Sequence, residues 1–249
     1  MSEEILEIKG LNKSFGGLHA TKNLDLVLQV GEQSAIIGPN GAGKSTLFNL
    51  ITGYHLPDSG HISFMGRDIT RRPPHLIARD GITRAFQISN IFTKLTVWEN
   101  VRSAVQAQMD LVFNLYCLAR RVGVSETGEI LELCGLLERR EIMAGELSQG
   151  DKKKLELAIA LAGKPKLLLL DEPTAGMSLD ETRDAMALVD RLNKELKVTI
   201  LFTEHDMSVV FKHARKVSLL HRGELLFSGS PQEVRENPTV QKIYLGEQH

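Results

Sequence analysis

A glycine-rich segment at residues 38–46 carries the clearest chemistry in this sequence. It fits the pattern G-x-x-x-x-G-K-[ST], in which backbone N–H groups converge on phosphate oxygens, the lysine neutralises the β- and γ-phosphates and the serine hydroxyl ligates magnesium. The alternative is a glycine-rich turn without a ligand. Because the pattern is complete and lies between a predicted strand and a predicted helix, we expect a nucleoside triphosphate site formed by Gly38, Asn40, Gly41, Ala42, Gly43, Lys44, Ser45 and Thr46.

Two acids end an apolar run at 167–170. Burying Asp171 and Glu172 at a strand end is costly unless they hold a cation or activate a reactant. We expect Asp171 to hold magnesium and Glu172 to accept a proton from the water that attacks the γ-phosphate. The alternative is a pair of solvated acids at a strand terminus.

His205 follows another predicted strand, at 198–202. A lone histidine is usually structural, but ligands of open α/β sheets gather beyond the carboxyl ends of the strands. Lys44, Glu172 and His205 each follow a different predicted parallel strand. We therefore expect His205 to contact the γ-phosphate.

The segment Leu-Ser-Gln-Gly-Asp at 147–151 precedes an amphipathic helix. Ser148 is a candidate N-cap, and Gly150 would let the backbone approach an anion closely. By itself the segment is only a helix start. The lysines at 152–154 are typical of a solvated face, and in an almost neutral chain they do not indicate nucleic-acid binding.

The elements that position these residues follow from hydrophobic periodicity. Leucines at 24, 26 and 28, with Val30, predict a half-buried strand of an antiparallel sheet, and residues 61–65 predict another. Apolar runs at 34–37, 167–170 and 198–202 predict buried strands. Strand–helix–strand repeats imply a parallel sheet with right-handed crossovers, and hence an α/β fold. The helix before the last strand has an apolar face that consists of Ala185, Leu188, Val189, Leu192 and Leu196.

The stretch 73–152 shows no strong strand and several helix-like segments, with a predicted loop at 123–128. We expect an inserted α-helical subdomain within a single domain spanning 1–249. The predicted boundaries are 88–155 for the helical subdomain, and 1–87 with 156–249 for the nucleotide-binding core and its N-terminal antiparallel β subdomain.

The charge and the hydropathy of the chain limit the classes of partner that we expect it to bind. A formal net charge of −1 gives no electrostatic basis for nucleic-acid binding, so we expect no nucleic-acid partner. The most apolar span, near 111–119, is far shorter than the ~20 residues that cross a bilayer. Any role at a membrane would depend on a partner protein.

Taken together, these segments resemble the ATPase of ABC transporters over essentially the whole chain. The resemblance rests on their order: the P-loop, Gln87, Leu-Ser-x-Gly, the apolar strand ending in Asp171 and Glu172, then His205. It implies a RecA-like P-loop NTPase core with ATP and Mg²⁺ as cofactors. The residues it implies are Glu172, His205 and Gln87 for catalysis, Ser45, Gln87 and Asp171 for the metal, Phe15 for adenine stacking, and Ser148 and Gly150 for the nucleotide of a second cassette.

Within this family the chain is most similar to LivG-like subunits of branched-chain amino acid importers. The strings that support this are Ser-Phe-Gly-Gly at 14–17, residues 81–87, residues 92–100 and Tyr-Leu-Gly-Glu at 244–247. The resemblance implies a peripheral protein on the cytoplasmic face of the inner membrane. Its partners would be transmembrane permease subunits, a second cassette, identical or related, and indirectly a periplasmic or extracellular solute-binding protein.

Three departures from the family pattern stand out. Gln149 and Asp151 replace a glycine and a glutamine of Leu-Ser-Gly-Gly-Gln, which puts the role of position 151 near the ribose in question. Phe15 replaces the more usual tyrosine. Ser178 occupies the position of the family's D-loop aspartate, and Asp180 is expected to be the N-cap of the next helix.

Three rival functions stay open from the sequence. A lipopolysaccharide-export ATPase shares parts of the same pattern. A soluble ABC ATPase of translation or DNA repair generally has two cassettes or a coiled-coil insertion, and this chain has neither. A P-loop phosphotransferase would leave Gln87 and Leu-Ser-x-Gly without a role.

Overall fold

The computed structural model describes residues 3–85, 91–108 and 122–245. The chain forms two compact units. Unit 1 comprises residues 1–84, 166–172 and 190–249, and unit 2 comprises residues 85–165 and 173–189. Across the described ranges, every helix is too short or too polar to span a bilayer.

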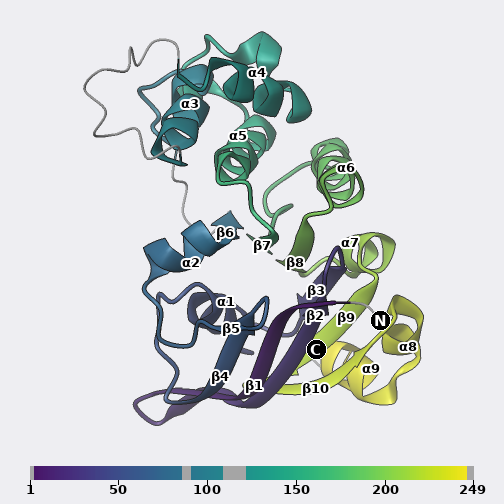
Figure 1. Cartoon of the computed structure of the whole chain (residues 1–249). Coiled ribbons are helices and arrows are strands. Elements are labelled where there is room, and N and C mark those ends of the chain that lie inside the picture. Colours follow the sequence, from purple (N-terminus) through teal and green to yellow (C-terminus); the bar gives the residue numbers. More distant parts are fainter. Residues whose placement is uncertain (1–2, 86–90, 109–121, 246–249) are drawn as a thin grey trace. The chain divides into compact units, whose positions relative to one another are not determined.

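Unit 1 begins with an antiparallel sheet of four strands (Figure 1), β1 (Glu4–Phe15), β2 (Leu18–Gln29), β4 (Ser59–Phe64) and β5 (Arg67–Asp68). Their order is β2-β1-β4-β5. Leu24, Leu26 and Leu28 are buried, as their alternation predicts. The prediction was wrong for Val30, which lies beyond the end of β2 and is 49% exposed.

The second sheet is the parallel one that the apolar runs predict. Its order is β10-β9-β3-β8-β7-β6. The central pairs β9/β3, β3/β8 and β8/β7 are parallel, and β10 is antiparallel to β9. The strands are β3 (Gln33–Ile37), β6 (Ile82–Ala85), β7 (Leu167–Asp171), β8 (Thr199–Thr203), β9 (Lys216–His221) and β10 (Glu224–Gly229).

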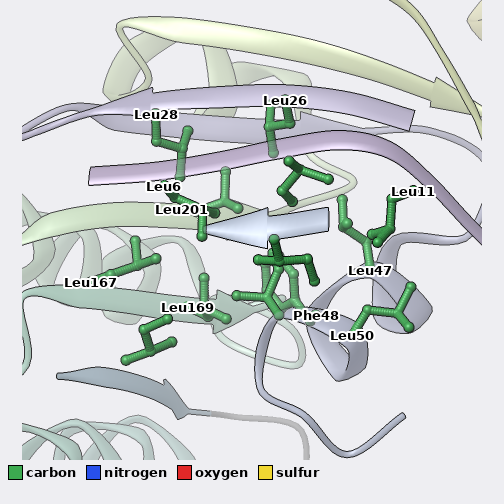
Figure 2. Close-up of a cluster of buried hydrophobic side chains, with 14 of the residues drawn as sticks. Leu6, Leu11, Leu26, Leu28, Leu47, Phe48, Leu50, Leu167, Leu169 and Leu201 are labelled. Carbon is green, nitrogen blue, oxygen red and sulfur yellow. The ribbon is translucent and has the colours of Figure 1, made fainter. Parts of the chain in front are cut away.

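The core of unit 1 packs both sheets around the first helix. Leu47 and Phe48 of that helix lie in one buried cluster with leucines of β1 and β2 and with Leu169 and Leu201 of the parallel sheet (Figure 2). The helices of unit 1 are α1 (Lys44–Ile51), α2 (Pro74–Asp80), α7 (Met207–His213), α8 (Pro231–Glu236) and α9 (Pro238–Leu245).

Unit 2 is helical in its described part. Helices α3, α4 and α5 pack against one another, with Val101, Leu131 and Leu155 fully buried. The elements are α3 (Val97–Gln108), α4 (Val124–Leu133), the 3₁₀ turns η3 (Leu137–Arg139) and η4 (Ala144–Glu146), and α5 (Gln149–Ala162). Helix α6 (Leu179–Leu196) starts in unit 2 and ends in unit 1. The predicted α/β fold class, with its parallel core, antiparallel β sheet and helical part, is thus confirmed.

Four local predictions were wrong. The strand β6 lies in a stretch where no strand was expected. Residues 123–128 form no loop, because Gly123 adopts a left-handed backbone and α4 starts at the next residue.

Leu196 is 51% exposed because it is the last residue of α6. The N-cap of α6 is Ser178, whose hydroxyl accepts a hydrogen bond from the Glu181 N–H at 3.3 Å, so Asp180 lies within the first turn.

Replacing Leu169 by alanine should lower the free energy of unfolding by about 2–5 kcal/mol, because it leaves a cavity in the fully buried cluster. Urea unfolding followed by circular dichroism measures this. The matched control is Leu226→Ala on β10, where the leucine is 41% exposed and the expected change is within about 0.5 kcal/mol. Equal losses in the two variants would contradict the placement of Leu169.

Candidate ATP site

The glycine-rich loop follows β3 and is closely approached by two other strands. All five residues of β3 are buried. A Cβ atom added to Gly38 would lie 2.1 Å from the carbonyl oxygen of Leu220, and one added to Gly43 would lie 2.3 Å from that of Ala20. Gly43 also has φ 109°, a backbone conformation that favours glycine. Neighbouring backbone therefore requires glycine at both ends of the loop.

The loop leads directly into the amino end of α1. Gly43 is the N-cap and offers no side-chain acceptor, and the first turn of α1 has no acidic residue. The partial positive charge of this helix end is therefore not offset locally. Ser45 is exposed on the first turn, and Asn40 and Gly41 are exposed in the loop. A loop with few side chains that leads into a helix without a side-chain cap leaves backbone N–H groups available to a phosphate group.

Lys44 is folded back onto the loop. Its Nζ donates to the carbonyl oxygens of Gly38 at 2.6 Å and Pro39 at 3.2 Å, and the residue is 7% exposed. Burial lowers the pKa of this ammonium group, while the charges of Glu172 and Asp171 raise it. The lysine thus lies within the electrostatic reach of both acids at the end of β7.

The register of the parallel sheet aligns the strand ends that carry the site. Ile36 of β3 pairs with Thr203 of β8, and Thr203 pairs with Asp171 of β7. The glycine-rich loop starts two residues after Ile36, and His205 lies two residues after Thr203. The structure therefore brings the loop, both acids and His205 to the same edge of the sheet, as expected for an open α/β sheet.

The two adjacent acids have different surroundings. Asp171 is 9% exposed, and its Oδ1 accepts a hydrogen bond from the Thr203 hydroxyl at 2.7 Å. Glu172 has a left-handed backbone, with φ 51°, and its N–H donates to the carbonyl oxygen of Thr203 at 3.1 Å. Its carboxylate Oε1 lies 2.8 Å from His205 Nε2, and both side chains are more than 40% exposed. Asp171 is therefore held by neighbouring protein groups, whereas the Glu172 carboxylate is accessible to water.

Phe15 ends β1 in the hairpin that leads to Ala20, the residue whose carbonyl oxygen limits Gly43. Its ring is 43% exposed and meets the His55 ring edge-on at 5.2 Å between centroids. The exposed part of the ring is available for stacking. Gln87, the third predicted catalytic residue, lies outside the described residues.

The predicted residues of unit 2 lie at the amino end of α5. Ser148 is the N-cap, as predicted, and its hydroxyl accepts a hydrogen bond from the Asp151 N–H at 3.2 Å. A Cβ atom on Gly150 would lie 2.8 Å from Glu181 Oε1. Hydrogen bonds from Ser178 hold the pKa of Glu181 below its usual range, and the Gly150 N–H contributes. Gly150 is thus already in contact with a carboxylate of its own unit.

Comparison with known proteins decides the family. The sequence matches the ABC transporter family over residues 21–175, and the family described as branched-chain amino acid ATP-binding cassette transporter over residues 224–249. The chain belongs to the ABC transporter family. It is an ATPase cassette with the nucleotide-binding character of that family, as the sequence predicts.

Its relatives match along nearly the whole cassette. The high-affinity branched-chain amino acid transport ATP-binding protein BraF of Pseudomonas aeruginosa is 37% identical, and LivG of Escherichia coli is 36% identical, each over 99% of this chain and all of the relative. The crystal structure of a nucleotide-free ATP-binding cassette from an ABC transporter has a TM-score of 0.87 at 30% identity, covering 98% of this chain and 100% of that one. A dimeric cassette in a post-hydrolysis state with ADP and Pi has a TM-score of 0.77 at 26% identity, covering 91% and 99%.

Sequence reasoning gave no role to two residues that contact Asp171 in this ABC cassette. One is Thr203, and the other is Arg84, whose Nη2 lies 2.6 Å from Asp171 Oδ2. Thr203 ends an apolar strand two residues before His205, and Arg84 lies three residues before Gln87. Their closeness in the sequence to His205 and Gln87 was the signal that could have identified Thr203 and Arg84 as candidates.

Asp151, one of the departures from the family motif, is engaged within its own unit. Its Oδ2 lies 2.7 Å from Arg139 Nη1, and its Oδ1 lies 3.7 Å from Lys154 Nζ. The aspartate is 9% exposed. Its contacts are those of a residue that orders the start of α5.

Replacing Gly43 by alanine should weaken ATP binding by at least about tenfold, equivalent to ~1.4 kcal/mol, because the loop must move away from Ala20. The free energy of unfolding should also fall. The control is Gly41→Ala, where nothing lies within 4 Å of the added Cβ, so only the left-handed backbone lowers stability, by about 1–2 kcal/mol. Calorimetry and chemical denaturation measure both effects. Equal losses of stability at the two positions would contradict the steric account.

Proposed function

We propose that this ATPase cassette energises the import of branched-chain amino acids or a related small polar solute. The support is the likeness to BraF and LivG along nearly the whole chain and the family match of residues 224–249. Two cassettes, identical or related, pair at the cytoplasmic face of the inner membrane and drive transmembrane permease subunits. A periplasmic or extracellular solute-binding protein delivers the solute to these permeases.

The single observation that carries the site assignment is the alignment of three strand ends. The register Ile36–Thr203–Asp171 joins the glycine-rich loop, Glu172 and His205 at one edge of the sheet. ATP phosphates bind in the loop against the amino end of α1, and Lys44 turns from the loop carbonyls to the β- and γ-phosphates. The whole chain, 1–249, acts as one ATPase domain in which Phe15 stacks on adenine.

Magnesium fits the residues that surround this edge. The hydroxyl of Ser45 is exposed on the first turn of α1, and the carboxylate of Asp171 is already fixed by two neighbours. Oxygen ligands of this kind are those that Mg²⁺ prefers. We assign Ser45, Asp171 and Gln87 to hold the ion, which when bound neutralises charge on the phosphate oxygens.

Glu172 is the catalytic base in this proposal. Its half-exposed carboxylate accepts a proton from water as the water oxygen bonds to the γ-phosphorus and the bond to the β-phosphate oxygen breaks. His205, 2.8 Å from the same carboxylate, orients Glu172 and contacts the γ-phosphate together with Gln87. The products are ADP and inorganic phosphate.

Ser148 and Gly150 act on the nucleotide of the partner cassette. They lie at the amino end of a helix of fourteen residues, where backbone N–H groups suit an anion. Each cassette therefore supplies half of two ATP sites. The dimeric cassette with ADP and Pi supports this arrangement.

Replacing Glu172 by glutamine should lower turnover by about 10²- to 10⁴-fold, the usual contribution of a general base, while ATP still binds. Steady-state phosphate release and calorimetry measure the two effects. The control is Glu195→Gln, an exposed glutamate on α6, which should keep full turnover. Undiminished hydrolysis by the Glu172→Gln protein would remove Glu172 from the mechanism.

Purification of the cassette from its native membranes tests the transport assignment. We expect permease subunits of a branched-chain amino acid or related importer to copurify with it. Permeases of a lipopolysaccharide exporter, or ribosomes or DNA in place of permeases, would contradict the import proposal. Phosphate transfer that depends on a small acceptor would instead identify a phosphotransferase.

A further inference from the structure

Arg84, near the end of β6, is held in place by two different acceptors. Its Nη2 donates to Asp171 Oδ2 and its Nη1 donates to Asn49 Oδ1 of α1, each at 2.6 Å. Its guanidinium also lies over the ring of Phe48, 5.4 Å from the ring centroid. The side chains of Arg84 and Asp171 are only 8% and 9% exposed. The arginine therefore joins the first helix to the carboxyl end of β7.

The contact fixes both oxygens of Asp171. Oδ2 receives the guanidinium, and Oδ1 receives the hydroxyl of Thr203 at 2.7 Å. Lys44, the other cation near this edge, donates instead to the carbonyl oxygens of Gly38 and Pro39. In the part of the chain that the structure describes, Arg84 is the cation that forms the ion pair with Asp171.

A buried carboxylate needs such a counter-charge. Removing one partner of a buried ion pair leaves the other charge uncompensated, which is strongly destabilising. Lysine would keep the charge but not the planar fork that reaches two acceptors at once. The two terminal nitrogens of Arg84 donate to two separate acceptors, Asn49 and Asp171, and a lysine ammonium could not reproduce this geometry.

We propose that Arg84 is a positioning residue for magnesium binding. Anchored by Asn49, it holds the Asp171 carboxylate in one orientation, so that the remaining lone pairs of the carboxylate are directed to the metal that accompanies ATP. Outer-shell partners of metal-binding carboxylates have this effect in other proteins. The inference rests on the proposed function, because it takes Asp171 as the magnesium ligand.

The test compares ATP binding with and without magnesium. In the Glu172→Gln background, in which turnover is expected to be slow, calorimetry gives the Kd for ATP in EDTA and in saturating Mg²⁺. The ratio of the two Kd values measures what the metal contributes to ATP binding. Arg84→Lys should reduce this ratio by about tenfold or more, the usual loss for an outer-shell partner, and leave the Kd in EDTA unchanged. Asn49→Ala, which keeps the arginine and removes its anchor, should shift the ratio in the same direction by less.

Two control variants and one comparison of outcomes separate a positioning role from a purely structural one. Arg67→Met, at an exposed arginine on β5, should leave both Kd values unchanged. A well-folded Arg84→Lys protein with the ratio of the parent would overturn the inference, as would equal weakening in EDTA and in Mg²⁺, which is the result of a purely structural role. Asp171→Asn should abolish the metal contribution. If it does not, the magnesium assignment itself fails, whatever Arg84 does.

Discussion

The close approach of backbone to the glycine-rich loop is the constraint on which the site depends. Carbonyl oxygens of Leu220 and Ala20 occupy the space that side chains at Gly38 and Gly43 would need. The loop is therefore bare, and the buried ammonium of Lys44 satisfies two of its carbonyl oxygens. Phosphate is a stronger partner for this ammonium than a neutral carbonyl, because both groups are charged. In the proposed site, the same packing that shapes the loop thus places the lysine where a triphosphate would bind.

The two adjacent carboxylates at the end of β7 have contrasting surroundings, which suit the different roles proposed for them. Asp171 still belongs to the strand and is held by an arginine and a hydroxyl, which suits a fixed metal ligand. Glu172 follows in a left-handed conformation that costs about 1–3 kcal/mol and leaves its carboxylate half exposed beside His205. Pairs of titratable groups in contrasting environments are typical of acid–base sites. The strained backbone is consistent with this division of roles.

The strands that precede the motifs could be predicted from the sequence, whereas the residues that hold the motif side chains in place could not. Buried runs such as 167–170 are recognisable because short continuous apolar stretches bounded by turns are typical of strands in a parallel sheet. Strand β6 was missed because its four residues, Ile-Thr-Arg-Ala, are too few and too polar to show a period. The pairing of Arg84 with Asp171, 87 positions away, could not be read from local patterns because only the tertiary fold brings the two together. Ser178 departs from the family pattern and is the N-cap of α6. Its hydroxyl accepts a hydrogen bond from the Glu181 N–H, and the Glu181 carboxylate accepts one from the Ser178 N–H.

The most direct test of the account is calorimetric titration of Mg·ATP into the Lys44→Ala protein. Lys44 supplies the positive charge of the loop and lies within electrostatic reach of Asp171 and Glu172 at the end of β7. The account predicts a large loss of affinity in a protein that stays folded, because no other side chain of the loop carries a charge. An affinity equal to that of the unaltered chain would contradict it.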